Sequence, residues 1–143
     1  MTNSYGKIAT NDDQSAIKIL LYDIGKETNV RLETIVLNEL QIYLNTIKSL
    51  SRASKTDFSN SINLSPRSVT RKLQKLETSY QEQLTNERLK RCDILIQQTS
   101  LSGARLSRFL GFENPSNFYQ WFKQHHGVAF TQFIDSARQH SDD

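Results

Sequence analysis

The chain has 143 residues, with 18 Lys and Arg against 15 Asp and Glu, so its formal net charge is +3. A single cysteine excludes an intramolecular disulfide, and no run of 18 apolar residues could cross a membrane. Two prolines and five glycines are too few for the many turns of an all-β fold. These counts lead us to expect an all-α fold. The first residues lack the basic and apolar segments of a secretory signal, so we expect a cytoplasmic protein.

The positive charge is concentrated after residue 53. Residues 1–53 hold six Lys/Arg and six Asp/Glu, whereas residues 54–138 hold twelve against seven. Residues 139–143 then form a short acidic tail. A basic segment is compatible with nucleic-acid binding, but this excess alone is also common in proteins that bind no DNA.

Two helices are expected before residue 54. Apolar spacing indicates a short helix over residues 12–25, which Gly25 ends, and a longer helix over residues 31–50. The longer helix carries an apolar stripe made of Leu32, Ile35, Val36, Leu40, Tyr43, Leu44 and Ile47. This stripe could complete the core of its own domain, or it could form a homodimer through residues 31–50.

A short helix followed by a capped helix is expected next. Ser54 and Asp57 resemble a capping box for the short helix, which should end near Leu64. Ser65 is then a cap and Pro66 stands at the first helical position, where its missing N–H costs nothing. This second helix has a buried stripe and an exposed polar ridge. The stripe is Val69, Leu73 and Leu76, and the ridge is Arg67, Thr70, Arg71 and Gln74.

Four further elements complete the chain. A capping box of Ser79 and Glu82 should open a long helix over residues 79–98. A short helix over residues 104–112 follows. Asn114 and Pro115 then repeat the cap-proline start, Gly127 ends that helix, and a last amphipathic helix covers residues 131–140.

The two short-helix and capped-helix pairs are copies of one pattern. At an offset of 49 residues, Ser65, Pro66, Val69 and Leu73 match Asn114, Pro115, Phe118 and Phe122. At an offset of 48, Phe58, Ser59, Ile62 and Leu64 match Leu106, Ser107, Leu110 and Phe112. A short helix, a tight turn and a capped helix form a helix-turn-helix. The repeat therefore predicts two helix-turn-helix subdomains joined by a long linking helix, after a short helical N-terminal extension.

A helix-turn-helix inserts its second helix into the major groove of DNA. Residues 66–76 and 115–125 are thus candidate recognition helices for successive major grooves, about 34 Å apart. Arg can bind guanine, and Asn or Gln can bind adenine. The candidates for base contacts are Arg67, Thr70, Arg71, Ser116, Asn117 and Gln120. The candidates for phosphate contacts are Ser65, Lys72, Lys75, Arg108 and Lys123.

Other functions have less support in the sequence. No catalytic triad, glycine-rich phosphate loop or set of metal ligands is present, so we expect no enzyme, cofactor or metal. Cys92 is interpreted as a small buried thiol, and Trp121 as a packing residue. The alternative function is a helical interaction or dimerisation module in which DNA reading has weakened.

Two segments resemble the C-terminal DNA-binding domain of the AraC/XylS family of bacterial transcription regulators. They are "LGFENPSNFYQWFKQHHGV" and "LSPRSVTRKLQKLETSYQEQLTNERL", and the resemblance covers about residues 36–136. It implies a seven-helix, two-lobed fold, a double-stranded DNA partner and contact with RNA polymerase. It divides the chain into an extension or linker (1–35), the DNA-binding domain (36–138) and the tail (139–143). The extension is too short for a ligand-binding barrel, so no effector site is expected.

The sequence departs from the family pattern at a few positions. Glu77 stands where the family often has Gly, Gln120 where it usually has Arg, and Trp121 where it usually has a small residue. Phe130 and Ile134 replace a common Pro and a common Arg. Because Gln120 supplies no charge, the second lobe is the weaker candidate for base reading.

Overall fold

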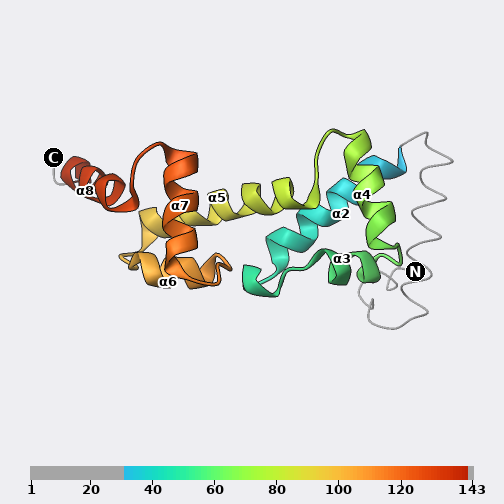
Figure 1. The fold of residues 1–143 in the computed structure, drawn as a ribbon, viewed down its shortest axis with the longest axis horizontal. Helices are drawn as coiled ribbons and strands as arrows, with labels where there is room; N and C mark the ends of the chain where they lie inside the picture. Colours follow the sequence, from blue (N-terminus) through green and yellow to red (C-terminus); the bar gives the residue numbers. More distant parts are fainter. Residues whose placement is uncertain (1–30, 142–143) are drawn as a thin grey trace, which may run out of the picture. The chain divides into compact units, whose positions relative to one another are not determined.

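The computed structural model describes residues 31–141, and every regular element in that range is helical. The elements are α2 (Leu32–Thr46), the 3-10 helix η2 (Leu50–Arg52), α3 (Lys55–Ser61), α4 (Pro66–Lys75), α5 (Tyr80–Gln98), α6 (Gly103–Phe109), α7 (Pro115–His126) and α8 (Phe130–Ser141) (Figure 1). The all-α prediction is confirmed for this range. The helix expected over residues 12–25 lies outside the described residues.

The chain forms two compact units, each with one helix-turn-helix. Of the described residues, the first unit contains 31–47 and 53–85, and the second contains 48–52 and 86–141. Helix α5 is continuous, so its first turns belong to the first unit and the rest to the second. Ser79 accepts a hydrogen bond from the Glu82 backbone N–H at 3.0 Å, as the capping box predicts.

The core of the first unit is formed by one face of α2 packed on α3 and α4. Its fully buried side chains are Val36, Leu40, Leu44, Phe58, Val69 and Leu73. The ring of Tyr43 lies 5.4 Å from that of Phe58, and its hydroxyl accepts a hydrogen bond from the Ser54 backbone N–H at 3.2 Å. Most of the apolar stripe of residues 31–50 is therefore used within its own unit.

Helix α2 is shorter than predicted. It ends at Thr46, because Ile47 adopts an extended backbone with φ −70° and ψ 130°. Leu50 is 2 % exposed and lies in η2, in the second unit. Apolar spacing alone could not show this, since Leu50 continues the helical period of α2 and yet packs elsewhere.

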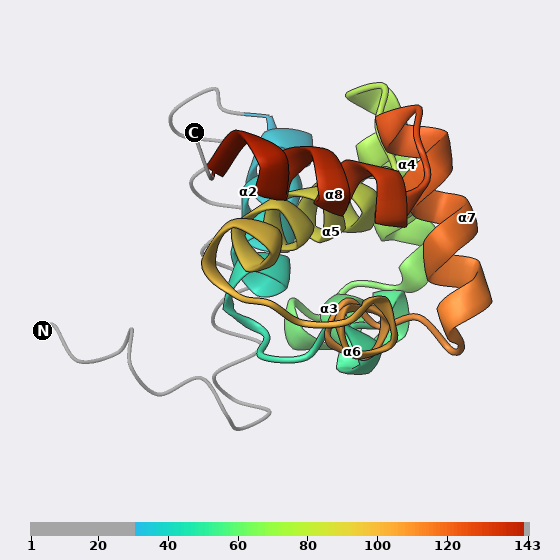
Figure 2. The same cartoon turned by 90° about the vertical axis from the view of Figure 1, so that its left-hand side faces the viewer.

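The second unit encloses an aromatic core between the later part of α5 and helices α6, α7 and α8 (Figure 2). The buried members are Cys92, Leu106, Leu110, Phe118, Phe122 and Phe130. The ring of Phe118 lies 5.4 Å from that of Phe130, and the ring of Phe122 lies 5.3 Å from it, both in edge-on geometry. Such edge-to-face pairs add stability beyond the burial of apolar area.

The internal repeat is confirmed in the hydrogen bonds of the two turns. In the first turn the Leu64 N–H donates to the Ser59 carbonyl, and in the second the Phe112 N–H donates to the Ser107 carbonyl, each at 3.0 Å. Both serines are buried. The residue before the N–H donor of each turn is left-handed, with φ 60° at Asn63 in the first turn and 85° at Gly111 in the second. Asn and Gly are the residues that adopt this conformation most readily.

Candidate nucleic-acid interface

The first recognition candidate, α4, begins where the sequence predicts. Ser65 caps it, because its Oγ accepts a hydrogen bond from the Ser68 backbone N–H at 3.0 Å, and Pro66 is the first helical residue. The Ser65 hydroxyl also donates to Ser68 Oγ at 3.1 Å. This hydroxyl is therefore engaged within the helix, which leaves little of it for a phosphate.

The outer face of α4 carries the predicted polar ridge. Val69 and Leu73 are fully buried, whereas Arg67 and Arg71 are exposed and Thr70 is half-buried. Within residues 31–141 neither arginine forms an ion pair. The structure thus places the three predicted base contacts of α4 on one accessible face, with both guanidinium groups available. Leu76, predicted as part of the buried stripe, is only half-buried because it already lies at the end of the helix.

The lysines of α4 differ from each other. Lys72 is half-buried, and the side chain of Lys75 is 68 % exposed. Lys75 Nζ lies 3.6 Å from Oε2 of Glu33 in α2. The lysine is exposed, whereas the Glu33 side chain is only 15 % exposed, so this ion pair is partly shielded from solvent.

The second candidate, α7, has the same start and a different surface. Asn114 Oδ1 accepts a hydrogen bond from the Asn117 N–H at 3.0 Å, and Gly127 ends the helix in a left-handed conformation. Phe118 and Phe122 face the core, while the base-contact candidates Ser116, Asn117 and Gln120 are exposed. The cationic candidates of this unit, Arg108 on α6 and Lys123 on α7, are exposed as well. No Lys or Arg lies in the first two turns of α7, so its ridge is polar and neutral.

Arg88 of α5 fixes the turn of the second helix-turn-helix. Its Nε donates to the Leu110 carbonyl at 2.8 Å and an Nη donates to the Gly111 carbonyl at 3.3 Å. Its guanidinium lies 4.4 Å from the centre of the Phe112 ring. The sequence interpretation gave Arg88 no role of its own. Its position four residues after buried Leu84 and four before Cys92 was the available signal, since it puts an arginine on the core face.

The cap of α6 was also missed. Ser102 Oγ accepts a hydrogen bond from the Arg105 N–H at 3.3 Å, so α6 begins at Gly103. A Cβ on Gly103 would lie 2.3 Å from the Tyr119 hydroxyl, which shows how closely α6 and α7 approach. The packing role expected for Trp121 is confirmed, because its ring lies 5.3 Å from that of Phe112 and 6.2 Å from that of Phe118.

A family model described as a helix-turn-helix domain matches residues 58–136, which is more than half of the chain. The chain belongs to the AraC family of DNA-binding transcription regulators. This is a family of transcription factors, not of enzymes. The AraC-type match includes both helix-turn-helix motifs from Phe58 onward.

Curated AraC-family relatives come from Escherichia coli. The transcriptional activator CsvR is 25 % identical over 133 residues, covering 87 % of this chain and 50 % of the relative. The activator CfaD is 25 % identical over 135 residues, covering 89 % of this chain and 51 % of the relative. The activator AggR is 26 % identical over 140 residues, covering 92 % of this chain and 53 % of the relative. The chain thus spans about half the length of the curated relatives it matches.

Solved structures agree with the fold. A DNA-binding transcriptional dual regulator from Escherichia coli K-12 matches with a TM-score of 0.64 at 24 % identity, over 71 % of this chain and 90 % of that one. The C-terminal domain of AraT, a response regulator from Geobacillus stearothermophilus, matches with a TM-score of 0.64 at 22 % identity, over 71 % and 84 %. At this level of identity the likeness concerns the fold alone.

The structure shows the consequence of one departure from the AraC-family pattern. Glu77, at the position where the family often has Gly, has a φ of 58°. The Thr78 N–H next to it donates to the Leu73 carbonyl at 3.1 Å, which closes the end of α4. This is the left-handed end that usually selects glycine, so Glu77 holds a strained conformation.

Cys92, interpreted from sequence as a small buried thiol, and His126, a residue of α7, pack in the second unit. Cys92 is fully buried, and burial, followed by the neighbouring charge of Asp93, raises the pKa of its thiol to about 12. His126 stacks on Phe122 at 3.9 Å, and its Nε2 lies 3.4 Å from Asp93 Oδ1. In residues 31–141 no three potential metal ligands gather in one place, and no helix there has the length and apolar character needed to span a bilayer.

Proposed function

We propose that α4 is the principal base-reading helix of this regulator and that α7 supports it with hydrogen bonds. The observation that carries the proposal is that Arg67 and Arg71 are exposed on a capped helix whose opposite face is buried, and that neither forms an ion pair within the described residues. Arg67 and Arg71 have the fork of donors that suits guanine, and Thr70 lies between them on the same ridge. On α7, Ser116, Asn117 and Gln120 offer neutral donors and acceptors, of which Asn117 and Gln120 suit adenine.

Backbone contacts are proposed for the cationic residues around the two helices. Lys72 and Lys75 flank the ridge of α4, and Arg108 and Lys123 serve the second unit. Lys75 would exchange Glu33 for a phosphate oxygen. Because its hydroxyl is used in the cap, Ser65 would contribute its backbone N–H at the start of the helix.

For the whole chain we propose transcriptional regulation at the bacterial nucleoid, through residues 36–138, with contact to RNA polymerase. The names of CsvR, CfaD and AggR as activators support a role that includes activation. A homodimer through residues 31–50 would have to use the outer face of α2, where Ile42 is 55 % exposed, since Val36, Leu40 and Leu44 are buried in the unit. Sedimentation of the wild type beside Ile42→Ser tests this: a dimer that persists unchanged in the variant would refute the interface.

The deciding experiment is selection of bound duplexes from a random-sequence pool at about 150 mM salt, where phosphate attraction alone is weakened. An enriched site with two elements about 10 base pairs apart supports reading by both units. A single short element supports reading by α4 with a positioning role for α7. Binding at low salt without any enrichment refutes base reading and favours the interaction-module alternative.

Substitutions then separate base contacts from phosphate contacts. Arg71→Ala should cost about 1–3 kcal/mol on the selected site and relax one base position. Lys123→Ala should weaken all duplexes equally and reduce the salt slope by about one. Arg138→Ala, an exposed arginine of α8 outside the predicted site, is the matched control and should leave both properties unchanged. An equal loss on every sequence for Arg71→Ala would assign Arg71 to the backbone.

A further inference from the structure

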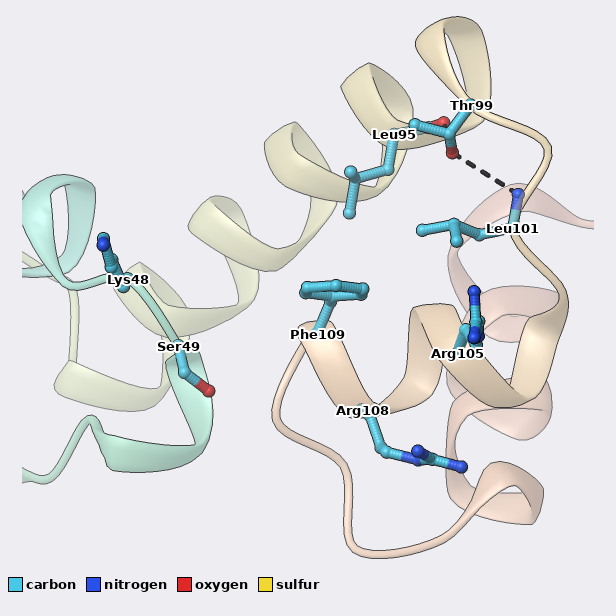
Figure 3. A pocket seen from close by; sticks show the side chains of 8 residues that line it. All are labelled: Lys48, Ser49, Leu95, Thr99, Leu101, Arg105, Arg108 and Phe109. Atoms are coloured by element: carbon cyan, nitrogen blue, oxygen red, sulfur yellow. Dashed lines mark hydrogen bonds between the residues drawn. The ribbon is translucent and has the colours of Figure 1, made fainter.

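The second unit has an open groove away from the predicted DNA-contact residues of α7. It is a hollow of about 820 Å³ between the end of α5, helix α6 and the segment before η2. Leu95, Leu101 and Phe109 point toward one another and form its floor (Figure 3). Lys48 lies across the groove from Arg105 (Figure 3).

The groove also exposes large apolar side chains that are not part of the buried core. Helix α6 buries Leu106 and Leu110, whereas Phe109 faces outward and is 54 % exposed. Ile94, on the neighbouring turn of α5, is 45 % exposed. Ile94 lines a second hollow of about 220 Å³ that shares Lys48, Leu95 and Phe109 with the first. The two hollows therefore form one continuous apolar surface, of the kind that marks binding sites on soluble proteins.

All charged residues that line this surface are cationic. Lys48, Arg91, Arg105 and Arg108 line the two hollows, and no carboxylate does. Arg91 is held by Glu87 at 2.8 Å and by the Lys48 carbonyl at 3.0 Å. Within the described residues Lys48 and Arg105 have no ion pair, so their charges are available to a ligand.

We propose that this groove docks an acidic amphipathic segment of a partner protein. An apolar side chain of the segment would cover Phe109, and its carboxylates would face Lys48 and Arg105. The continuity of the two hollows favours a peptide segment over a compact ligand, and a cationic lining without carboxylates favours an acidic segment. Arg108 lines the groove and is also a proposed phosphate contact, whereas Phe109, Lys48 and Arg105 belong to no proposed DNA contact. The docking is argued from these three residues, so it goes beyond the DNA-reading function and does not depend on it.

The test is a selection of 16-residue peptides from a random display library on the immobilised full chain, followed by affinity measurements on synthetic copies. We expect the enriched peptides to combine one or two large apolar residues with two or more Asp or Glu. Phe109→Ser should weaken their binding by about tenfold or more, as loss of a central aromatic anchor does. Arg105→Glu should weaken it by a factor that shrinks as salt is raised, because the contact is exposed and electrostatic.

Two matched variants guard the interpretation. Val128→Ser removes another exposed apolar residue of the second unit, and Arg138→Glu reverses an exposed arginine of α8. Both variants should bind the peptides as the wild type does. Phe109→Ser should also retain wild-type affinity for the selected DNA duplex and an unchanged unfolding midpoint, which shows that the variant is folded. Failure of DNA reading in the wild type would not alter these peptide results.

Several outcomes overturn the proposal. They are no enrichment, enriched peptides without acidic residues, or peptides whose binding ignores both Phe109→Ser and Arg105→Glu. A concentration-dependent dimer of the wild type that Phe109→Ser abolishes would identify a second copy of the chain as the occupant, and this result also refutes the partner segment.

Discussion

Gly111→Ala is the substitution whose cost follows most directly from the structure. Gly111 has a φ of +85°, a conformation that costs an alanine about 1–2 kcal/mol. An added Cβ would also lie 2.8 Å from the Leu50 carbonyl carbon and 2.9 Å from the Ser51 nitrogen. Both are backbone atoms, which cannot rotate away as a side chain can. Overpacking of this kind costs about 1–3 kcal/mol, and the smaller entropy of the unfolded alanine chain returns about 0.4–1 kcal/mol. We expect a net loss of about 2–4 kcal/mol in the free energy of unfolding.

Urea unfolding followed by tryptophan fluorescence measures this loss in the right part of the chain. Trp121 is the only tryptophan and lies in the second unit, in contact with Phe112 of the same turn. Asn63→Ala is the matched control, because Asn63 occupies the equivalent position of the first turn with a φ of 60°. It already carries a Cβ, so we expect a loss of only about 1 kcal/mol, measured by circular dichroism.

Gly111→Asn separates the two contributions. Asn tolerates the left-handed backbone and still adds a Cβ, so the variant should remain clearly destabilised if the approach of Leu50 and Ser51 dominates. A Gly111→Ala stability within about 0.5 kcal/mol of the wild type, the usual range of a harmless surface change, would refute both the turn conformation and the position of η2 against it.

Three other residues give predictions of different kinds. Arg88→Met should destabilise the second unit by about 2–4 kcal/mol in the same fluorescence assay, because two turn carbonyls lose a charged donor. Arg88→Lys should recover less than half of this loss, since one ammonium group cannot reproduce the two donors of the guanidinium, and full recovery would contradict the geometry. Glu77→Gly should stabilise the first unit by about 0.5–1 kcal/mol in thermal unfolding, since it relieves the left-handed strain at φ 58°, and a destabilised variant would mean that the Glu77 side chain is needed. Because the buried Cys92 thiol has a raised pKa, its contribution to stability is complete below about pH 9 and is lost as pH rises toward 12. The free energy of unfolding should therefore fall more steeply between pH 8 and 11 for the wild type than for Cys92→Ala. The same pH dependence in both proteins would exclude a buried thiol.

Much of the fold follows from local rules, which explains why it could be predicted. Ser54, Ser65, Ser79 and Asn114 all accept the backbone hydrogen bond expected of a cap three residues later. Most repeated apolar positions are buried in matching pairs, among them Phe58 with Leu106 and Leu73 with Phe122. Cap bonds and helical periodicity involve residues that are close in sequence, so the pattern alone is sufficient to place them.

The features that were missed depend on contacts between distant residues. Leu50 leaves the period of α2 because it packs in another unit, next to Gly111. Arg88 acquires its role from the carbonyls of a turn 22 and 23 residues later. The ion pair of Lys75 likewise comes from α2, through Glu33. Helical spacing says which face a residue occupies, but it does not say what lies against that face.

Helices α4 and α7 share one frame, namely a cap, a proline and two buried residues, but they present different side chains. This difference bears on function more than the shared frame does. Both recognition candidates have the cap, the proline and two buried anchors, so the frame explains only how a helix is presented. On α4 the presented face holds Arg67 and Arg71, whereas the corresponding turns of α7 hold Ser116, Asn117 and Gln120. Each cation that reaches DNA releases counterions. If the two helices bind DNA as proposed, we therefore expect α4 to contribute more to the salt dependence of binding than α7. Neutral side chains can still discriminate bases through hydrogen bonds, and they do so without attracting the protein to every sequence. Attraction and discrimination are therefore divided unequally between two copies of one motif.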